Sequence, residues 1–447
     1  MIFPSTYSVP CIAGDAAKLG TLNVTVPGSK SITNRALLLA MLANGTSTLR
    51  GALFSDDSRH FVSCAKDLGF EVTANEETAE ITVVGHGGAI PKQEASIYVG
   101  SAGTAARFLT AVLGIENGTY HLDASPQMRK RPMGPLLAGL AELGCEIECE
   151  ENPECFPFTL RSKGFQTDAA TINVDRSSQF LSALLIASCL SPKDFTTLVT
   201  GAHGMAYVEM TRRMMEQFGV KLQKLPISPN DTLVTQKYLT PAGQSYEARD
   251  YQIEPDVSGA SYFYALCPLL GIPVRVSHVH FDSLQGDVEF LRILTRLGCE
   301  AADLPEGILL TPPKKGTYPG ITVDMSACSD QAITMAALAP FAEGPTTITG
   351  LRHIRFQESD RLSAMETELR RLGITCETTE DSITIWPGTP KPALIKTYED
   401  HRMAMGFALI GLRCPGIVID DPSCCKKTFE NYYEVLEKVL CISVKTC

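Results

Sequence analysis

The chain has 447 residues, of which 44% are hydrophobic and 20% are charged, a composition that excludes a disordered, collagenous or coiled-coil protein and allows two or three cores. Its 39 Lys and Arg residues against 50 Asp and Glu give a formal net charge of −11, which argues against a non-specific nucleic-acid or anionic-membrane partner. Any anionic ligand must therefore meet a local cluster of cations.

The ends and the apolar runs predict a cytoplasmic protein. The opening MIFPSTYSVPCIAG has neither the basic start nor the long apolar core of a secretory leader. Apolar runs such as 180–190 are shorter than the roughly 20 residues that a membrane span needs. The 15 cysteines include no C-x-x-C pair, so we expect free thiols in a reducing compartment and no metal site.

In chain order, the first repeated element is an amphipathic helix that ends in a glycine followed by a strand-like run. Five such segments read KDLGFEV, AELGCEI, EQFGVKL, TRLGCEA and RRLGITC, with glycines at Gly69, Gly144, Gly219, Gly298 and Gly373. The glycines are 75, 75, 79 and 75 residues apart, and a sixth helix over 432–440 lacks the glycine. Each glycine is expected to take a left-handed conformation at the end of its helix.

A second element alternates with the first: a helix that is apolar on nearly every side and is therefore expected to be buried. These helices follow Lys30, Gly103, Gln179, Gly259, Asp330 and Arg402, and strand-like runs begin near Gly45, Gly118, Asp194, Gly271, Gly344 and Gly416. The two patterns together predict six α/β units of about 75 residues. The widest spacing, around 228–256, suggests two halves of three units each.

Polar residues open the buried helices, and several of them are cations. Ser, Thr, Asp and Gly at these points are ordinary N-caps. N-capping does not explain the cations in the first turn or two of these helices, because the helix dipole disfavours positive charge there. These cations are Lys30, Arg35, Arg107 and Arg402. The cations at 129–131, taken alone, would be a solvated charge run, but they occupy the same place before their helix as the cations at 361 and 427 and so favour one convergent site. A shared phosphate or carboxylate ligand would account for all of them.

Other chemistries find weaker support. PGSK lacks the spacing of a nucleotide-binding phosphate loop, and no His or Cys pattern indicates zinc. Asp330 and Glu358 are the candidates for acid–base work, with an N-cap or a surface ion pair as the structural alternative.

The motifs together resemble one family, the 5-enolpyruvylshikimate-3-phosphate (EPSP) synthases, or 3-phosphoshikimate 1-carboxyvinyltransferases. The matching segments run from residue 27 to 436: PGSKSITNRALLLA, GSAGTAARFL, KRPMGPL, SSQFLSALL, LQGD, the Asp330 helix, QESDRL, YEDHRMAM and KTFENYYEVL. The resemblance implies an α/β fold of two domains, each with three βαβαββ repeats arranged as an inside-out α/β barrel. It also implies that 1–28 and 254–447 form one discontinuous domain, that 29–253 form the other, and that the active site lies in the cleft between them.

The resemblance implies transfer of the enolpyruvyl group of phosphoenolpyruvate to the 5-hydroxyl of shikimate 3-phosphate through a tetrahedral intermediate, in aromatic amino acid and chorismate biosynthesis. By motif, the catalytic positions are Asp330, Glu358 and Lys30. Shikimate 3-phosphate would meet Lys30, Ser31, Arg35, Ser177, Ser178, Gln179, Tyr207, Asp330, His353 and Gln357. Phosphoenolpyruvate would meet Lys30, Gly103, Arg131, Gln179, Arg361, Arg402 and Lys427. We expect no metal, no cofactor, no nucleic acid or membrane partner, and a cytoplasmic monomer.

Three positions depart from the family pattern. Gln357 stands where the family usually has lysine, Gly204 replaces a usual serine in an S-x-P-Y motif, and Ser329 replaces a common proline before Asp330. Two alternatives remain open. One is the sister enzyme that transfers enolpyruvate to UDP-N-acetylglucosamine, whose catalytic cysteine is missing from SPQMRKRP; the other is a non-enzymatic six-unit clamp on nucleic acid, which the acidic charge disfavours.

Overall fold

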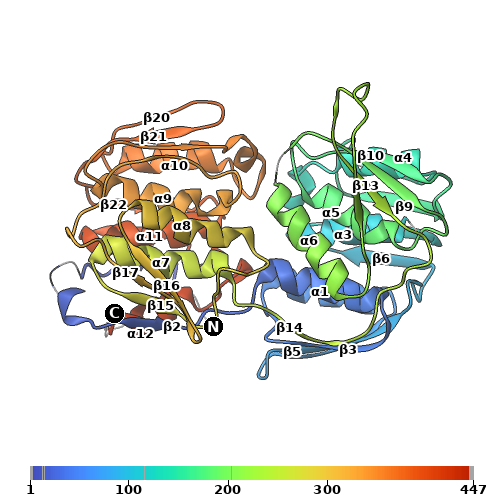
Figure 1. Cartoon of the computed structure of the whole chain (residues 1–447), viewed down its shortest axis with the longest axis horizontal. Coiled ribbons are helices and arrows are strands. Elements are labelled where there is room, and N and C mark those ends of the chain that lie inside the picture. The colour runs from blue at the N-terminus through green and yellow to red at the C-terminus, as the bar shows by residue number, and fades with distance from the viewer. Residues whose placement is uncertain (1–3, 13, 15, 115, 203, 442–447) are drawn as a thin grey trace. The chain divides into compact units, whose positions relative to one another are not determined.

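The computed structural model describes residues 4–12, 14, 16–114, 116–202 and 204–441. It divides into two compact units (Figure 1). The discontinuous unit joins residues 1–27 to 254–447, and the continuous unit spans 28–253. Each unit is built from the repeated α/β module that the sequence predicts.

One sheet of the continuous unit shows the plan of the module. Strand β6 (Glu94–Tyr98) pairs parallel with β7 (Asn117–Asp123), and the buried helix α3 (Gly103–Leu113) connects them. Strand β9 (Phe158–Lys163) then pairs antiparallel with β7, and β8 (Glu146–Cys149) pairs antiparallel with β9. The order along the chain is therefore βαβαββ, because helix α4 separates β7 from β8.

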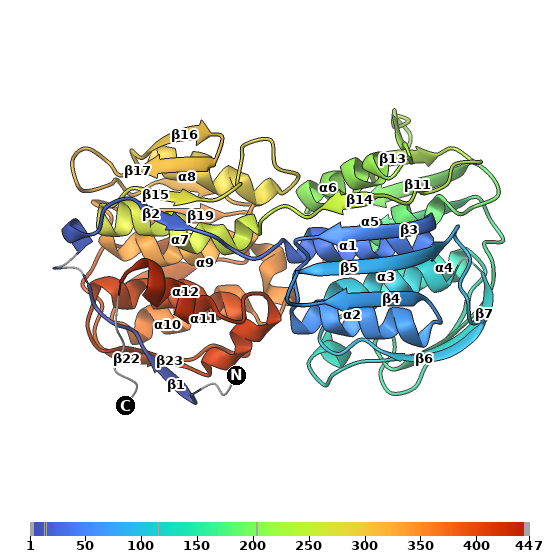
Figure 2. The same cartoon turned by 90° about the horizontal axis from the view of Figure 1, so that it is seen from below.

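The other two sheets of the continuous unit repeat this arrangement of neighbouring strands. They are β14–β3–β5–β4 (Asp250–Gln252, Asn44–Arg50, Glu80–His86, Glu71–Asn75) and β10–β11–β13–β12 (Ala169–Asn173, Phe195–Thr200, Val234–Thr240, Gln223–Leu225). Figure 2 shows β3, β5 and β4 side by side. Strand β14 lies about 200 residues after its parallel partner β3, so the last strand of this segment completes its first sheet.

The discontinuous unit uses the start of the chain in the same way. Its sheets are β2–β15–β17–β16 (Leu22–Val24, Val274–Val276, Gly307–Thr311, Glu300–Leu304), β18–β19–β21–β20 (Thr322–Asp324, Thr346–Thr349, Ile383–Ile385, Cys376–Thr378) and β22–β23–β1 (Ala393–Ile395, Ile417–Asp420, Thr6–Ser8). Strand β2 pairs parallel with β15, and β1 pairs antiparallel with β23. These two pairings tie the first residues to a unit that otherwise begins at Glu254.

The predicted apolar helices are buried. They are α1 (Lys30–Leu42), α3 (Gly103–Leu113) and α5 (Gln179–Ser188) in the continuous unit, and α7 (Val257–Leu270), α9 (Ala332–Leu338) and α11 (His401–Arg413) in the discontinuous unit. Helices α7, α9 and α11 contact one another, as do α3 and α5. Each buried leucine of these helices stabilises its unit by about 1.5–3 kcal/mol relative to an exposed one.

The second set of helices confirms the predicted glycine ends. These helices are α2 (Asp56–Asp67), α4 (Gly134–Glu142), α6 (Met205–Gln217), α8 (Glu289–Arg296) and α10 (Arg361–Arg371), with α12 (Tyr432–Val439) as the sixth. The glycines after the first five have φ of 94°, 94°, 92°, 94° and 77°. A positive φ is costly for any residue with a Cβ, which explains why glycine recurs at these points.

Short 3₁₀ helices carry many of the polar motifs. They are η1 (Ala16–Lys18), η2 (Met128–Lys130), η3 (Gly286–Val288), η4 (Ser329–Gln331), η5 (Ala339–Phe341), η6 (Arg352–Phe356) and η7 (Pro422–Lys427). Two of them, η3 and η4, run directly into an α-helix, so their side chains lie near a helix N-terminus.

Candidate active site

Arg361 is the centre of a polar cluster in the discontinuous unit. The side chain of Asp360 caps helix α10 by accepting from the Ser363 amide, which makes Arg361 the first helical residue. The Arg361 side chain is only 1% exposed, and it donates through Nη1 to Asp330 Oδ1 at 2.8 Å and through Nη2 to Glu358 Oε2 at 2.9 Å. One guanidinium therefore contacts both carboxylates that the sequence proposes for proton transfer.

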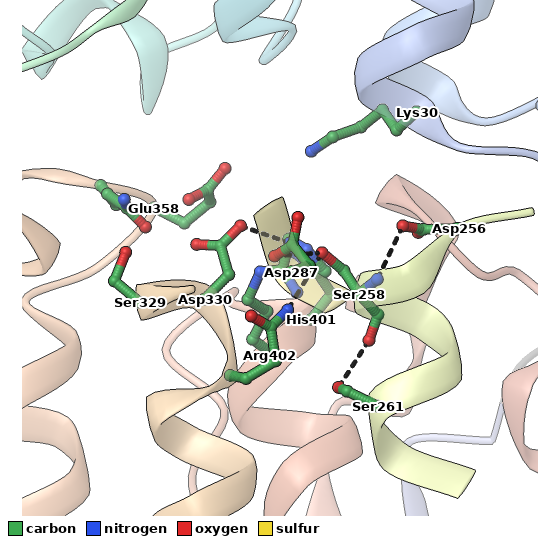
Figure 3. Close-up of polar contacts among 12 residues, drawn as sticks. Lys30, Asp256, Ser258, Ser261, Asp287, Ser329, Asp330, Glu358, His401 and Arg402 are labelled. Carbon is green, nitrogen blue, oxygen red and sulfur yellow. Dashed lines mark hydrogen bonds and ion pairs between the residues drawn. The ribbon is translucent and has the colours of Figure 1, made fainter. Parts of the chain in front are cut away.

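Asp400 fixes the other side of this guanidinium. It is fully buried, it accepts from Arg361 Nε at 2.8 Å, and it caps helix α11 by accepting from the Arg402 amide at 3.0 Å. Arg402 in turn donates through Nη2 to Asp330 Oδ2 at 2.5 Å (Figure 3). Asp330 is thus held between two arginines that come from two different helix N-termini.

Lys427 completes the cluster from η7. Its Nζ lies 3.2 Å from Glu358 Oε1, and both side chains are 10% exposed. Together with Arg361, this lysine leaves Glu358 with a cation at each carboxylate oxygen.

The charges of this cluster balance: Asp330, Glu358 and Asp400 face Arg361, Arg402 and Lys427. Burial works against the charge of Arg361, but Asp400, Glu358 and Asp330 outweigh it and hold the pKa of Arg361 above its ordinary value. The cations at these helix starts are therefore neutralised by carboxylates, which the helix pattern alone did not predict.

Two departures from the family pattern have a structural role here. Ser329 Oγ lies 2.7 Å from Nε2 of the buried His353, in a position where proline has no hydroxyl to offer. Gln357 accepts a hydrogen bond from Arg361 Nη1 through Oε1. The residue in place of the usual lysine thus contacts the same guanidinium as Asp330 and Glu358.

Arg35 is held by neutral groups in the continuous unit. It is 2% exposed and donates to Thr211 Oγ1 at 2.7 Å, to the Ser31 carbonyl at 3.0 Å and to the Tyr207 carbonyl at 3.3 Å. Its guanidinium also lies over the Phe108 ring, 5.2 Å from the centroid. Burial lowers the pKa of Arg35 to about 10, so it stays charged at neutral pH.

The start of helix α3 lies against two other arginines. A Cβ at Gly103 would be 2.6 Å from Arg107 Nη1 and 2.9 Å from Arg131 Nη1, so only glycine lets both guanidinium groups approach the backbone there. The neighbouring Thr104 accepts from Gln179 Nε2 at 3.4 Å. The helix starts at Gly103 and Gln179 therefore meet in this unit.

The third departure, Gly204, is dictated by the backbone. Gly204 has φ of 67° before helix α6, and a Cβ there would lie 2.6 Å from Ser178 Oγ. Ser177 caps its own turn by accepting from the Gln179 amide at 3.2 Å. A serine at position 204 would be strained and would collide with Ser178 in this conformation.

Lys30 is the first residue of helix α1. Its Nζ lies 3.6 Å from Oδ2 of Asp57, a nearly buried carboxylate in the first turn of helix α2. The lysine is 15% exposed, so its ammonium keeps access to solvent beside this partner.

Sequence reasoning missed Asp400 and Tyr262 as parts of the cluster. Asp400 had a visible signal, because it precedes His401 and Arg402 in EDHR and an Asp at that point is a natural N-cap. Tyr262 had none: it lies within an apolar run, yet its hydroxyl is 3.5 Å from Arg402 Nη1.

Three further observations concern the described part of the chain as a whole. No group of three or more His, Cys, Asp or Glu side chains there could hold a metal ion. No helix within the described ranges is long and apolar enough to cross a membrane. All 14 cysteines that the structure describes are free thiols.

Comparison with known proteins now adds to this geometry. A family model described as "EPSP synthase (3-phosphoshikimate 1-carboxyvinyltransferase)" matches residues 19–436. The chain belongs to the EPSP synthase family. It is 44% identical to the 3-phosphoshikimate 1-carboxyvinyltransferase of Nostoc punctiforme over 411 residues, which cover 92% of this chain and 94% of the relative. It is 39% identical to the enzyme of that name from Sulfurovum sp. over 420 residues, 93% of this chain and 96% of the relative.

Solved structures confirm the fold of the family. The EPSP synthase of Acinetobacter baumannii superposes with a TM-score of 0.77 at 22% identity, covering 97% of this chain and 98% of that one. The enolpyruvyl transferase NikO of Streptomyces tendae superposes with a TM-score of 0.70 at 17% identity, over 94% of this chain and 95% of that one. The predicted fold of βαβαββ repeats of the enolpyruvyl transferase type is thereby confirmed.

Proposed function

We propose that this member of the EPSP synthase family transfers the enolpyruvyl group of phosphoenolpyruvate to the 5-hydroxyl of shikimate 3-phosphate and releases phosphate. The observation that carries the assignment to particular residues is the Arg361 cluster, in which Asp330 and Glu358 contact one guanidinium at 2.8 and 2.9 Å. Two carboxylates held close together suit a reaction that moves two protons at neighbouring atoms.

Asp330 and Glu358 take the proton-transfer roles. Asp330 accepts the proton of the 5-hydroxyl as the hydroxyl oxygen attacks C2 of phosphoenolpyruvate. Glu358, which enters this step protonated, gives its proton to the methylene carbon. The product of this addition is a tetrahedral ketal phosphate. Glu358 then takes back a methyl proton as the C2–O bond to phosphate breaks, which restores the double bond, and the proton held by Asp330 leaves with the departing phosphate.

The cations hold the substrates and stabilise their charge. Arg361, Arg402 and Lys427 already lie against Asp330 and Glu358, so a bound carboxylate or phosphate of phosphoenolpyruvate would meet charged donors beside both proton-transfer groups. Gly103, Arg131, Gln179 and Lys30 are the proposed contacts from the continuous unit. Lys30 also serves the catalytic set, as a cation beside the group that departs.

The proposed contacts of shikimate 3-phosphate also come from both units. Those of the continuous unit are Lys30, Ser31, Arg35, Ser177, Ser178, Gln179 and Tyr207, and those of the discontinuous unit are Asp330, His353 and Gln357. Because neither unit carries the complete set, we propose an active site in a cleft to which both contribute. The proposed reaction moves protons, forms one C–O bond and breaks another, and we assign it no metal or organic cofactor.

We propose a cytoplasmic monomer with small anions as its only partners. The free state of the described cysteines supports a reducing compartment. The formal charge of −11 supports small anionic ligands over an extended polyanion, because cations are concentrated at helix starts.

The test measures inorganic phosphate released by the purified protein. We expect release only when phosphoenolpyruvate and shikimate 3-phosphate are both present, and none with phosphoenolpyruvate alone. Phosphate release with UDP-N-acetylglucosamine in place of shikimate 3-phosphate would assign the chain to the sister reaction. If no phosphate is released with either acceptor, the proposed activity is refuted.

A further inference from the structure

A buried carboxylate that the proposed mechanism does not use lies next to the cluster. Asp287, in η3, is 2% exposed, and its Oδ1 accepts a hydrogen bond from Ser258 Oγ at 3.1 Å (Figure 3). The same Ser258 oxygen accepts from Gln331 Nε2 at 3.1 Å. Gln331 directly follows Asp330 in η4, so three hydrogen-bonded side chains connect Asp287 to the turn that carries Asp330.

The chain of hydrogen bonds joins separate elements of the fold. Ser258 lies at the start of α7, where Asp256 is the N-cap and accepts from the Ser258 amide at 3.1 Å. Asp287 precedes α8, and Gln331 precedes α9. All four side chains are buried, so a displaced member would leave a polar group without water to replace its partner.

Charged groups near Asp287 come from several elements. Asp256 stands at the N-cap of α7, Asp330 and the Cys328 thiol lie beside η4, and Arg402 comes from α11. In α8, Glu289 instead pairs with Arg292 at 2.7 Å. Burial is the largest influence on the pKa of Asp287 and raises it, as do Asp330 and Asp256. Arg402 and a hydrogen bond from Gln331 lower it. Together they leave the pKa of Asp287 at about 6. Above that pH the group is a carboxylate, and burial holds the pKa of Cys328 well above its usual range, so the thiol adds no charge.

We propose that ionised Asp287 is a positioning residue for Asp330, which it orients through Ser258 and Gln331 and whose basicity it sustains by like-charge repulsion. The inference rests on the proposed role of Asp330 as the group that accepts the hydroxyl proton. A negative charge beside Asp330 favours the uptake of that proton. Asp287 touches neither substrate in this account and acts only through its neighbours.

The ionisation of Asp287 should make kcat depend on pH. The pKa of Asp287 lies above that of a free aspartate, so the active, ionised form is present at neutral pH and is lost as the pH falls through about 6. We therefore expect kcat to fall on the acid side near that pH. Measuring kcat at saturating substrate keeps the titration of the free substrates out of the profile.

The experiment compares the pH profile of kcat for phosphate release in the wild-type protein and in two variants. Asp287→Asn removes the titrating group, so the acid limb should move down by about one pH unit or more while the plateau falls about three- to tenfold. Ser258→Ala removes a hydrogen bond to the carboxylate, so its acid limb should move to higher pH. The KM of both substrates should stay within about twofold in each variant.

Glu289→Gln is the matched control, because it removes a neighbouring carboxylate outside the hydrogen-bonded chain, and its profile should match the wild type. If the acid limb of the kcat profile stays at its wild-type pH in both variants, the inference is overturned, whatever the thermal stability of the variants. If Asp287→Asn does not fold, the direction of the Ser258→Ala shift decides alone. A wild-type protein that releases no phosphate refutes the proposed function instead, which keeps the two failures distinct.

Discussion

Arg361 shows how one buried side chain can organise a reaction centre. It contacts Asp330, Glu358 and Asp400, which belong to three separate segments. A buried guanidinium with three carboxylate partners keeps its charge and its orientation, since each loss of a partner would leave a buried charge uncompensated. Asp330 and Glu358, the carboxylates proposed for proton transfer, are 16% and 10% exposed and so have access to solvent. Asp400 is fully buried, and its role is to hold Arg361 in place.

Glu358→Gln tests this division at the scale of one residue. The amide keeps the size of the side chain but cannot exchange a proton, so kcat should fall by a factor on the order of 10²–10⁴ while the KM for shikimate 3-phosphate changes little. Steady-state phosphate release measures both constants. Glu366→Gln, in the helix that Arg361 begins, is the control and should keep wild-type turnover; near-normal kcat in Glu358→Gln would remove Glu358 from the proton transfer.

At the scale of the element, the two ends of the helices have different roles. The N-terminal ends carry the polar motifs, because unpaired backbone amides and the helix dipole attract anions there. The C-terminal ends of five outer helices carry a glycine with positive φ, which reverses the chain into the next strand. Function and fold are thus encoded at opposite ends of the same helices.

Gly298→Ala tests the fold side of this division. Gly298 has φ of 94°, and a Cβ there would lie 3.4 Å from Pro313 Cβ, an ordinary contact, so the cost is conformational and should be about 1–2 kcal/mol of the free energy of unfolding. Denaturant unfolding measures it. Gly20→Ala is the control, because Gly20 lies outside the left-handed region and a Cβ would meet nothing within 4 Å. Equal stability of both variants would contradict the conformational argument.

At the scale of the whole molecule, the proposed catalytic set is divided between the two units. Asp330, Glu358, Arg361, Arg402 and Lys427 belong to the discontinuous unit, whereas Lys30, Gly103 and Arg131 belong to the continuous unit. The chain crosses between the units twice, after Pro27 and after Ile253. The proposed reaction draws on both sets, so we expect the two units to approach each other when both substrates bind, because water must leave the reacting atoms.

Solution scattering tests this expectation on Glu358→Gln, which should bind both substrates and turn them over far more slowly than the wild type. The radius of gyration should decrease when shikimate 3-phosphate and phosphoenolpyruvate are added together. Sulfate at matched ionic strength is the control and should leave the radius unchanged. An unchanged radius with both substrates bound, as shown by calorimetry on the same sample, would contradict closure.

The repeat and its helix ends were predictable from the sequence because they depend on nearby residues. The recurrence of Gly69, Gly144, Gly219, Gly298 and Gly373 reflects a φ that each short segment needs on its own, and an apolar helix is recognisable within one heptad or two. The motifs also identified Asp330, Glu358 and Arg361 as candidates, since these are polar residues at helix starts.

Their partnerships were decided by the tertiary structure. Asp400 and Arg361 are 39 positions apart, and Tyr262 and Arg402 are 140 apart. In the hydrogen-bonded chain of Asp287, Ser258 and Gln331, the successive partners are 29 and 73 positions apart. Such contacts exist because α7, α9, α10 and α11 pack together and bring their N-terminal ends close to one another. The sequence alone determined which side chains stand at the helix starts, and packing determined which of them touch, because hydrogen bonds and charge act over a few ångströms whatever the separation along the chain.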